Sequence, residues 1–396
     1  MDEALKRANS ILSAIVCGTV LLSSCIKQPE ELPVPETALE LVKEMGNGWN
    51  LGNTMECVAK DCRFATDFEQ AWGNIKTTQA CMDGIRDSNI KSVRIPVAWS
   101  NLMSTEGGKY TISQDYFDRV DQIVNYALND GLYVIINIHW DGGWWSDFGA
   151  ADSTIKRDRA FRKFQSMWTQ IAVHYRDYSK RLIFECANED LGDKLGEGNR
   201  KFDSDKCYET CNFLNQAFVD IVRNAGGKND SRFLLISGYN ADIDKTCDDR
   251  FVVPTDVIDN HLLISVHYYT PAQYCLISNV GNSWGYRDSW GTPLDKAVMK
   301  ADFEKMQKFS EQGYGVVVGE YGVARTVEGK SQTLKDGTFD YVQSIVDTSK
   351  EYNYCPMFWD SGFWYDRRAC KFRYDELTNI FTNADADETT TETTTE

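Results

Sequence analysis

Apolar residues in the middle of the chain fall into eight short runs, separated by longer amphipathic stretches. Most of these runs are β-branched or otherwise apolar throughout, the pattern of strands buried on both faces in a parallel sheet. The sequence therefore predicts eight strands, at 46–53, 92–97, 133–139, 182–189, 233–239, 262–269, 315–321 and 355–361.

The stretches between the runs carry the 3.6-residue period of helices that bury one face. Apolar residues recur on a single face at 116–128, 161–175 and 214–225, and glycines stand near several expected helix ends, where C-terminal caps are common. Strands that alternate with helices in this way predict an α/β protein with a (β/α)8 TIM barrel. The main alternative is an open doubly wound sheet. Such a sheet would normally carry a glycine-rich phosphate loop after its first strand, and this sequence has none there.

The beginning of the chain reads as a targeting segment. Lys6 and Arg7 precede an apolar run at 11–22, which is too short to span a bilayer but is typical of a signal peptide. The Leu-Ser-Ser-Cys that ends at Cys25 resembles a bacterial lipobox, which would make this cysteine a lipidated anchor. We therefore predict a signal peptide or lipoprotein leader at 1–25 and a protein that is secreted or held at the cell surface.

Two polar segments flank the barrel region. Residues 26–37 combine three prolines with acidic residues and are predicted to be a linker. Residues 384–396 form an Asp/Glu/Thr tract that cannot pack and is predicted to be a disordered linker to a further module. The folded domain is then expected at 38–383, with no membrane-spanning segment after the leader, and we expect it to be a monomer.

Composition narrows the class of partner. A formal net charge of -17 makes nucleic acid a poor partner, because phosphate binding requires a Lys/Arg surface. A neutral polymer fits better. Aromatic residues make up 12% of the chain, and exposed rings can stack on sugar faces, although a large core rich in rings would give the same composition.

The 12 cysteines leave their chemistry open. Cys57 with Cys62, and Cys207 with Cys211, are close enough in sequence to pair in an exported protein, but free or buried thiols explain them equally well. Their spacings match no zinc pattern and the chain has only 4 histidines, so we expect no metal.

Ionisable and aromatic residues gather where the predicted strands end. In a (β/α)8 barrel the active site forms at the C-terminal ends of the strands. The strands end, in chain order, with Arg94, with His139 and Trp140, with Asn188 and Glu189, with His267 and Tyr269, with Glu320, and with Trp359 and Asp360.

Glu189 and Glu320, on the fourth and seventh predicted strands, would face each other across the barrel mouth. Two carboxyl groups about 5–5.5 Å apart are the arrangement of a retaining glycosidase, in which one protonates the leaving oxygen and the other attacks the sugar. The acid needs a raised pKa, while Arg94 and Tyr269 could keep the nucleophile ionised. Each residue also has an ordinary structural interpretation, such as a helix-terminal carboxylate for Glu189. Their coincidence at one end of the barrel favours catalysis.

Eight motifs resemble those of family 5 of the glycoside hydrolases across nearly the whole domain. They are GWNLGNTME (48–56), AWGNIKTT (71–78), VRIPVAW (93–99), INIHWDGGWW (136–145), FECANED (184–190), SVHYYTP (265–271), VVVGEYG (316–322) and FWDSG (358–362). The first two are most similar to those of endoglucanases that also accept xyloglucan, lichenan or glucomannan.

The resemblance implies a retaining endo-β-1,4-glucanase that acts on β-glucan polysaccharide or oligosaccharide without a cofactor. Glu189 would be the acid/base and Glu320 the nucleophile. It implies that Asn188 bonds the 2-hydroxyl of the sugar under attack and that Asn53 helps in the glycone subsites. Further supporting roles are implied for Arg94, His139, His267, Tyr269 and Trp359.

Two positions depart from the family pattern. Asp190 stands where the family usually has a proline after the acid; it would loosen the turn and place a second negative charge near Glu189. Trp140 stands where many relatives carry a second histidine, and its ring would reshape a sugar subsite.

Three alternatives remain open at this point. A β-mannanase or xylanase would use the same carboxylates with different subsite loops, and these loops include residues 279–292, which could equally form a packed flap. A carbohydrate-binding protein on a non-catalytic barrel is the second alternative, and a metal-dependent barrel enzyme is the third.

Overall fold

A computed structural model describes residues 32–151 and 153–383, and its core is a closed parallel barrel. The strands follow one another around it in the order β1-β12-β9-β8-β7-β6-β5-β2. The (β/α)8 barrel predicted from the hydrophobic pattern is therefore confirmed. Its strands are β1 (Gly48–Leu51), β2 (Ser92–Ile95), β5 (Tyr133–Asn137), β6 (Leu182–Glu185), β7 (Leu234–Ser237), β8 (Leu262–Tyr268), β9 (Gly315–Tyr321) and β12 (Cys355–Asp360).

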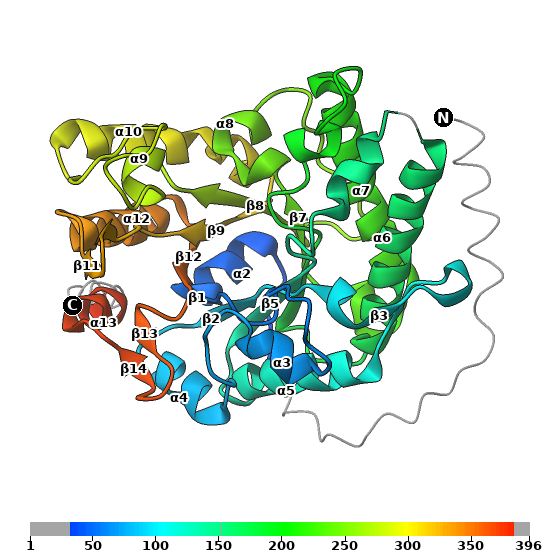
Figure 1. Ribbon diagram of the computed structural model, residues 1–396, viewed down its shortest axis with the longest axis horizontal. Helices are drawn as coiled ribbons and strands as arrows, with labels where there is room; N and C mark the ends of the chain where they lie inside the picture. The colour runs from blue at the N-terminus through cyan, green and yellow to red at the C-terminus, as the bar shows by residue number, and fades with distance from the viewer. Residues whose placement is uncertain (1–31, 152, 384–396) are drawn as a thin grey trace, which may run out of the picture.

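Helices form a ring around the strands (Figure 1). The predicted amphipathic stretches become α5, α6 and α7, whose apolar faces are buried in the main core. The helices are α2 (Ala38–Met45), α3 (Ala65–Gln70), α4 (Gln79–Asp87), α5 (Gln114–Asn129), α6 (Thr154–His174), α7 (Ser204–Asn224), α8 (Ile243–Thr246), α9 (Ala272–Cys275), α10 (Pro293–Lys305), α11 (Gln307–Ser310), α12 (Thr338–Tyr352) and α13 (Asp375–Asn383). Three small hairpins pair β3 (Met103–Ser104) with β4 (Thr111–Ile112), β10 (Thr326–Glu328) with β11 (Ser331–Thr333), and β13 (Tyr365–Asp366) with β14 (Lys371–Phe372).

Several strands end earlier than predicted, and at the barrel mouth side chains take the place of some backbone partners. The strand predicted to reach Glu189 ends at Glu185. Beyond it, the Ser237 hydroxyl donates to the Ala187 carbonyl and accepts from the Ala187 N–H. Asn137, the last residue of β5, accepts the Val97 N–H at 3.2 Å in the same way. The mouth is thus held by side-chain hydrogen bonds together with a few further backbone bonds, such as that from the His139 N–H to the Val97 carbonyl at 3.0 Å.

Helix α2 closes the other end of the barrel and lies at the centre of the view in Figure 1. Its apolar residues pack with side chains from the barrel floor, including Tyr133, Phe233 and Met357, in a second core cluster. Thr37 and Glu40 form a capping box that fixes the start of the helix. The barrel therefore opens at one end only, the end on which the polar residues lie.

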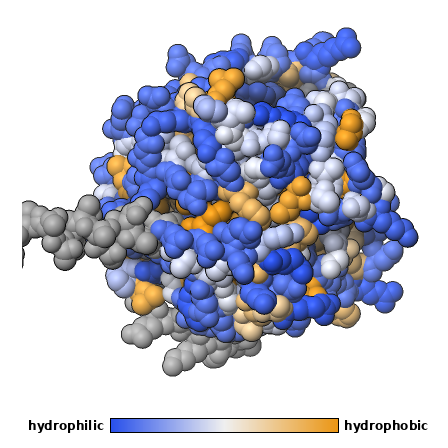
Figure 2. All heavy atoms as spheres, turned by 90° about the vertical axis from the view of Figure 1, so that its left-hand side faces the viewer, coloured by the Kyte–Doolittle hydropathy of each residue, from blue (hydrophilic) through white to orange (hydrophobic). Residues whose placement is uncertain are grey.

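The surface is mostly hydrophilic, and one side of it carries a band of hydrophobic residues near its middle (Figure 2). Within the described residues no helix is both long and apolar enough to cross a membrane. The ten cysteines of this part of the chain are all free thiols, so neither Cys57–Cys62 nor Cys207–Cys211 is bonded. The predicted leader at 1–25 and the tail at 384–396 lie outside the described residues, as does most of the predicted linker at 26–37.

Candidate active site

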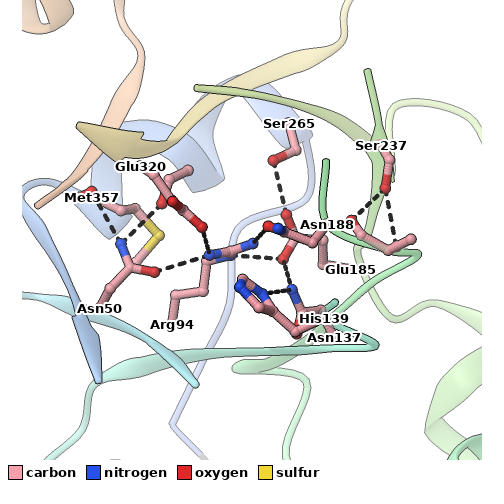
Figure 3. A network of polar contacts seen from close by, with 12 residues as sticks. Asn50, Arg94, Asn137, His139, Glu185, Asn188, Ser237, Ser265, Glu320 and Met357 are labelled. Carbon is pink, nitrogen blue, oxygen red and sulfur yellow. Dashed lines mark hydrogen bonds and ion pairs between the residues drawn. The ribbon is translucent and has the colours of Figure 1, made fainter. Parts of the chain in front are cut away.

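Arg94, on β2, is the centre of the polar network at the barrel mouth (Figure 3). Its side chain is fully buried and makes four short hydrogen bonds. Nε donates to Glu185 at 2.7 Å, and Nη1 donates to Glu320 at 2.8 Å and to Asn50 at 3.0 Å. Nη2 donates to Asn188 Oδ1 at 2.8 Å. One guanidinium therefore fixes side chains from β1, β6 and β9 and from the segment that follows β6.

Glu185 and Asn50 belong to this network, although the sequence interpretation passed over both. Glu185 is fully buried and also accepts from Ser265 Oγ at 2.8 Å and from Asn137 Nδ2 at 3.0 Å. Asn50 donates to the carbonyls of Gly319 at 2.9 Å and of Met357 at 3.0 Å. An acidic residue inside an apolar strand was the available signal for Glu185, because a carboxylate is costly to bury without partners.

Glu320 lies at the end of β9 with three donors around its carboxylate. Besides Arg94, Tyr269 Oη donates to Oε2 at 3.1 Å, and His267 Nδ1 lies 3.7 Å from the same oxygen. Burial raises the pKa of Glu320, and the charges of His267 and Arg94 oppose that rise. Burial, followed by the charge of Glu320, raises the pKa of Tyr269 well above its usual value, so the phenol stays a neutral donor.

Glu189 faces Glu320 from the turn after β6. Its side chain is 50% exposed, and His267 Nδ1 lies 2.7 Å from Oε1. Burial would raise the pKa of Glu189, but the hydrogen bond and the charge of His267 outweigh it and lower this pKa. One oxygen from each carboxylate and one nitrogen of His267 all lie within 4.8 Å of one another. The two carboxyl groups are therefore as close as a retaining glycosidase requires.

His139 and Trp359 form an aromatic wall beside the carboxylates. Their rings stack with centroids 6.0 Å apart and planes at 9°. Burial lowers the pKa of His139 well below its usual value, so this ring is neutral. Gly52 makes the approach of Trp359 to β1 feasible, since a Cβ at this glycine would lie 2.9 Å from Trp359 Cζ2. The indole is only partly buried and leaves area for a ligand.

Asn53 follows β1 in the left-handed backbone region, at φ +52°. Its backbone N–H donates to the buried Glu56 carboxylate, and its carbonyl accepts from Asn74 Nδ2 at 2.7 Å. Thr54 N–H donates to Glu56 at 2.8 Å. The loop that carries Asn53 is thus fixed by its own backbone, while the role of the side chain in a sugar subsite stays a prediction.

Trp140 is 42% exposed at the end of β5. The next residue, the buried Asp141, anchors its loop, because Asp141 accepts from Trp144 Nε1 at 2.7 Å and from the Ser100 N–H at 2.8 Å. Trp145 Nε1 donates to the Trp140 carbonyl at 3.1 Å. The Trp140 ring, which stands where many relatives carry a second histidine, is therefore held on a rigid loop at the barrel mouth.

Part of the 279–292 segment forms a packed flap. Trp290 is buried against Tyr341, with ring centroids 5.1 Å apart, and Tyr286 Oη lies 2.6 Å from Thr326 Oγ1. Trp284, by contrast, is 73% exposed. The alternative of a packed flap thus holds for the second half of the segment.

Asp190 is almost buried, with 6% of its surface exposed. Burial, and then the charge of Glu189, raise the pKa of Asp190 to about 8. Its carboxyl group is therefore protonated at neutral pH. The second negative charge that the sequence predicted near Glu189 arises only in alkaline solution.

Replacing Asp190 by asparagine is expected to stabilise the protein in alkaline solution. An unfolded aspartate titrates near pH 3.9, whereas the folded Asp190 keeps its proton up to about pH 8. Between these values the unfolded state binds fewer protons, so Asp190 lowers the free energy of unfolding as pH rises. We expect Asp190→Asn to raise that free energy by about 2 kcal/mol or more at pH 8 and by little at pH 4. Urea unfolding at both pH values measures this, with the exposed Asp259→Asn as the matched control; an equal change at both values would contradict it.

Glu189, His267 and Glu320 offer three atoms that could ligate a metal ion. The geometry does not favour this use, because His267 Nδ1 is already bonded to Glu189 and Arg94 is paired with Glu320. A divalent cation would have to break both contacts and lie next to a buried guanidinium. The donor set fits a hydrogen-bonded pair of carboxylates better than a metal centre.

Comparison with known proteins is consistent with this geometry. Residues 57–363 match the cellulase family, glycosyl hydrolase family 5. The chain is 35% identical to endoglucanase A of Paenibacillus barcinonensis over 353 residues, and this aligned region covers 83% of each protein. It is 32% identical to a xyloglucan-specific endo-β-1,4-glucanase of Bacteroides ovatus, over 83% of this chain and 65% of that one. A solved GH5-4 broad specificity endoglucanase from an uncultured bovine rumen ciliate superimposes with a TM-score of 0.76 at 30% identity, over 89% of this chain and 99% of that chain.

Proposed function

Because this chain belongs to the cellulase family, glycosyl hydrolase family 5, and is a glycoside hydrolase of the endoglucanase kind, we propose that it cleaves internal β-1,4 bonds of glucans with retention. Glu320 is the nucleophile and Glu189 the acid/base. The observation that carries the proposal is the placement of these two carboxylates and His267 within 4.8 Å of one another at the open end of the barrel. That separation leaves no room for the water molecule that an inverting enzyme places between its carboxyl groups.

In the first step Glu320 attacks the anomeric carbon and forms a glycosyl-enzyme bond while the leaving oxygen takes a proton from Glu189. Attack requires an ionised carboxylate. Arg94 Nη1 at 2.8 Å and Tyr269 Oη at 3.1 Å stabilise the charge on Glu320 against the effect of burial. Tyr269 contacts Oε2 while Arg94 contacts Oε1, so the orientation of the carboxylate is fixed before substrate binds.

The proton that the leaving group takes lies in the short hydrogen bond between His267 Nδ1 and Glu189 Oε1. The charge of Glu320 and the hydrogen bond to Glu189 raise the pKa of His267 despite its burial. In the open site the proton therefore favours the imidazole. A bound glycan would cover the half-exposed Glu189 and remove its water, which raises the pKa of a carboxyl group. The proton would then pass within the hydrogen bond from His267 Nδ1 to Glu189 Oε1, whose two atoms are 2.7 Å apart, and would be ready for the leaving oxygen.

In the second step Glu189 accepts a proton from water, which hydrolyses the glycosyl-enzyme with Glu320 as leaving group. The Asn188 amide, oriented by Arg94, supplies a donor near the 2-hydroxyl, and Trp359 supplies a ring face for the sugar under attack. His139, neutral and stacked on Trp359, completes this wall. Trp140 and Asn53 would contact the neighbouring sugars.

We propose β-1,4-linked glucan as the backbone of the substrate, in cellulose-like chains, lichenan, glucomannan or xyloglucan. The relatives named above act on glucans by their names, and this supports the choice over mannan or xylan. Export to the medium or the cell surface stays a prediction from the leader.

The test is hydrolysis of a panel of polysaccharides by the purified chain, with the product anomer followed by NMR. We expect fast cleavage of lichenan and soluble cellulose derivatives, slower cleavage of mannan and xylan, and β-anomers as the first products. A faster rate on mannan or xylan would assign that polysaccharide, and not glucan, as the substrate. Initial α-anomers would overturn retention, and glucan binding without cleavage would favour the non-catalytic alternative.

Chelation is expected to leave this activity unchanged. The charge of Glu320 is compensated by Arg94 and not by a metal ion, so dialysis against EDTA should alter the initial rate on lichenan by less than about twofold. A dialysed sample with added Mg²⁺ or Ca²⁺ is the control. Loss of most of the rate on dialysis, with recovery on adding metal, would contradict the prediction and support the metal-dependent alternative.

A further inference from the structure

The side-chain amide of Asn137, the last residue of β5, is held in one orientation by two partners (Figure 3). The Val97 N–H donates to Oδ1 at 3.2 Å, and a backbone N–H can only donate. The Glu185 carboxylate, which is paired with Arg94, accepts from Nδ2 at 3.0 Å. Both contacts require the same placement of the amide oxygen and nitrogen, so the network itself excludes the flipped amide.

This orientation decides which nitrogen of His139 carries a proton. Asn137 Nδ2 lies 3.3 Å from His139 Nδ1, and an amide nitrogen has only hydrogen atoms to offer. His139 Nδ1 must therefore be the acceptor. Burial lowers the pKa of His139 well below its usual value, so the ring is neutral and has a single ring proton. A neutral imidazole that accepts at Nδ1 carries this proton on Nε2.

His139 Nε2 faces the open mouth of the barrel. Among residues 32–151 and 153–383 no hydrogen bond is found for this atom, and it is not one of their buried side-chain atoms that lack a partner. It is therefore accessible to a ligand. The ring cannot turn freely, because it stacks on Trp359 with planes at 9°. The site thus presents a fixed N–H donor beside its aromatic wall.

We propose that Asn137 is a positioning residue that selects the tautomer of His139, so that Nε2–H faces the substrate as a hydrogen-bond donor. The inference rests on the proposed function for the identity of that substrate, a β-glucan. The donor serves a hydroxyl oxygen of the sugar that lies against Trp359. A hydroxyl that accepts from Nε2 keeps its own hydrogen for another acceptor, whereas the opposite tautomer would take that hydrogen for the ring.

A second route exists by which Asn137 could influence the reaction. Its Nδ2 also supports Glu185, which accepts from Arg94 Nε at 2.7 Å. Loss of the amide could therefore act on Arg94 and leave His139 as it is. A test has to read the state of His139 itself and then ask whether the effect of Asn137 on the rate needs that ring.

Nitrogen-15 NMR of the histidine side chains reads the tautomer directly. The chain has only 4 histidines, and a His139→Ala sample identifies the signals of His139. At neutral pH we expect Nδ1 at the chemical shift of a nitrogen without a proton and Nε2 at that of a protonated one. In Asn137→Asp an oxygen replaces Nδ2 and accepts from the ring, whether it is ionised or gives its own proton to Glu185. Nδ1 should then become protonated.

The NMR result can contradict the proposal in two ways. A protonated Nδ1 in the wild type would overturn the tautomer itself. An Nδ1 that stays without a proton in Asn137→Asp would show that Asn137 does not select it.

Rates on lichenan show whether this tautomer matters for the reaction. We expect Asn137→Asp to lower kcat/KM by at least about tenfold in the wild type, but by less than about twofold when it is added to His139→Ala. An equal loss in both backgrounds would place the effect on Glu185 and overturn the inference. Asn229 is the matched control, because it is fully buried and its Nδ2 donates to the Ala172 carbonyl, just before β7 begins at the barrel floor. Asn229→Asp should leave kcat/KM within about twofold.

Asn137→Ala decides the question if Asn137→Asp does not fold, since it places no new carboxyl group beside Glu185. Nδ1 should then show a shift between those of the two tautomers, and the loss of kcat/KM should again be absent in the His139→Ala background. A wild-type shift pattern in Asn137→Ala would overturn the inference. A wild type that is inactive on lichenan would instead refute the proposed function, and the NMR result would still decide the role of Asn137 in selecting the tautomer.

Discussion

Replacing Glu320 by glutamine is expected to lower kcat/KM for β-glucan by about 10⁴-fold or more, because the amide cannot form the glycosyl-enzyme bond. Glutamine keeps the shape of the side chain and can still accept from Arg94 Nη1. The loss should therefore appear without unfolding. Initial rates on lichenan, with far-UV circular dichroism of both proteins, measure the two effects. The exposed Glu376→Gln is the matched control and should retain full activity.

Substrates with different leaving groups distinguish the role of Glu320 from that of Glu189. Glu189→Ala should lower the rate on polysaccharide by about 10²–10⁴-fold, the usual range for a general acid. Aryl cellobiosides with acidic phenols need little protonation, so on them the glycosyl-enzyme should still form. Glu320→Gln should be inactive on both kinds of substrate. The reverse pattern, with the aryl substrate rescued in Glu320→Gln, would exchange the two assignments.

Replacing Arg94 by methionine is expected to reduce both activity and stability. It leaves Glu185 and Glu320 buried without their cation, and the removal of one partner of a buried ion pair costs about 3–5 kcal/mol. The remaining folded protein should be at least about 10²-fold slower, since Asn188 and Glu320 lose the donor that orients them. Urea unfolding and rates on lichenan measure the two losses.

A double variant shows where the stability is lost. Arg94→Met with Glu185→Gln removes the buried charge beneath the site, so it should recover part of the free energy of unfolding and none of the activity. The exposed Arg250, which pairs with Asp205 and Asp248 on the surface, offers a contrast. Arg250→Met should cost less than about 1 kcal/mol, because exposed ion pairs contribute little. Similar costs at positions 94 and 250 would refute the view of Arg94 as the central buried cation.

The spacing of apolar residues and the residue types at the predicted strand ends were enough to predict two things. One is the barrel, and the other is the gathering of Glu189, His267, Tyr269 and Glu320 at its mouth. They worked because parallel strands buried on both faces leave few places for a charged side chain. The C-terminal ends of the strands are where such a side chain finds both polar partners and solvent. The strand at 315–321 was predicted residue for residue, since it begins with the β-branched run at 316–318 and carries its one charged residue near its end.

Long-range contacts set the limits of that prediction. Glu185 lies inside the predicted strand at 182–189, and its partners Arg94 and Ser265 are distant in sequence, so no local pattern showed that its charge is satisfied. The early end of β6 depends on Ser237, on another strand. The protonated state of Asp190 likewise depends on burial that adjacent residues do not encode.

The helix that seals the barrel floor has a bearing on how the molecule could be tethered. The Pro33 carbonyl accepts from Arg181, and Leu32 lies beside Gly131, so the path into α2 runs along the face away from the carboxylates. An anchor joined to the chain before residue 32 would therefore hold the enzyme by the face opposite the active site. A long, stiff polysaccharide could then lie across the opposite face without steric conflict with the tether.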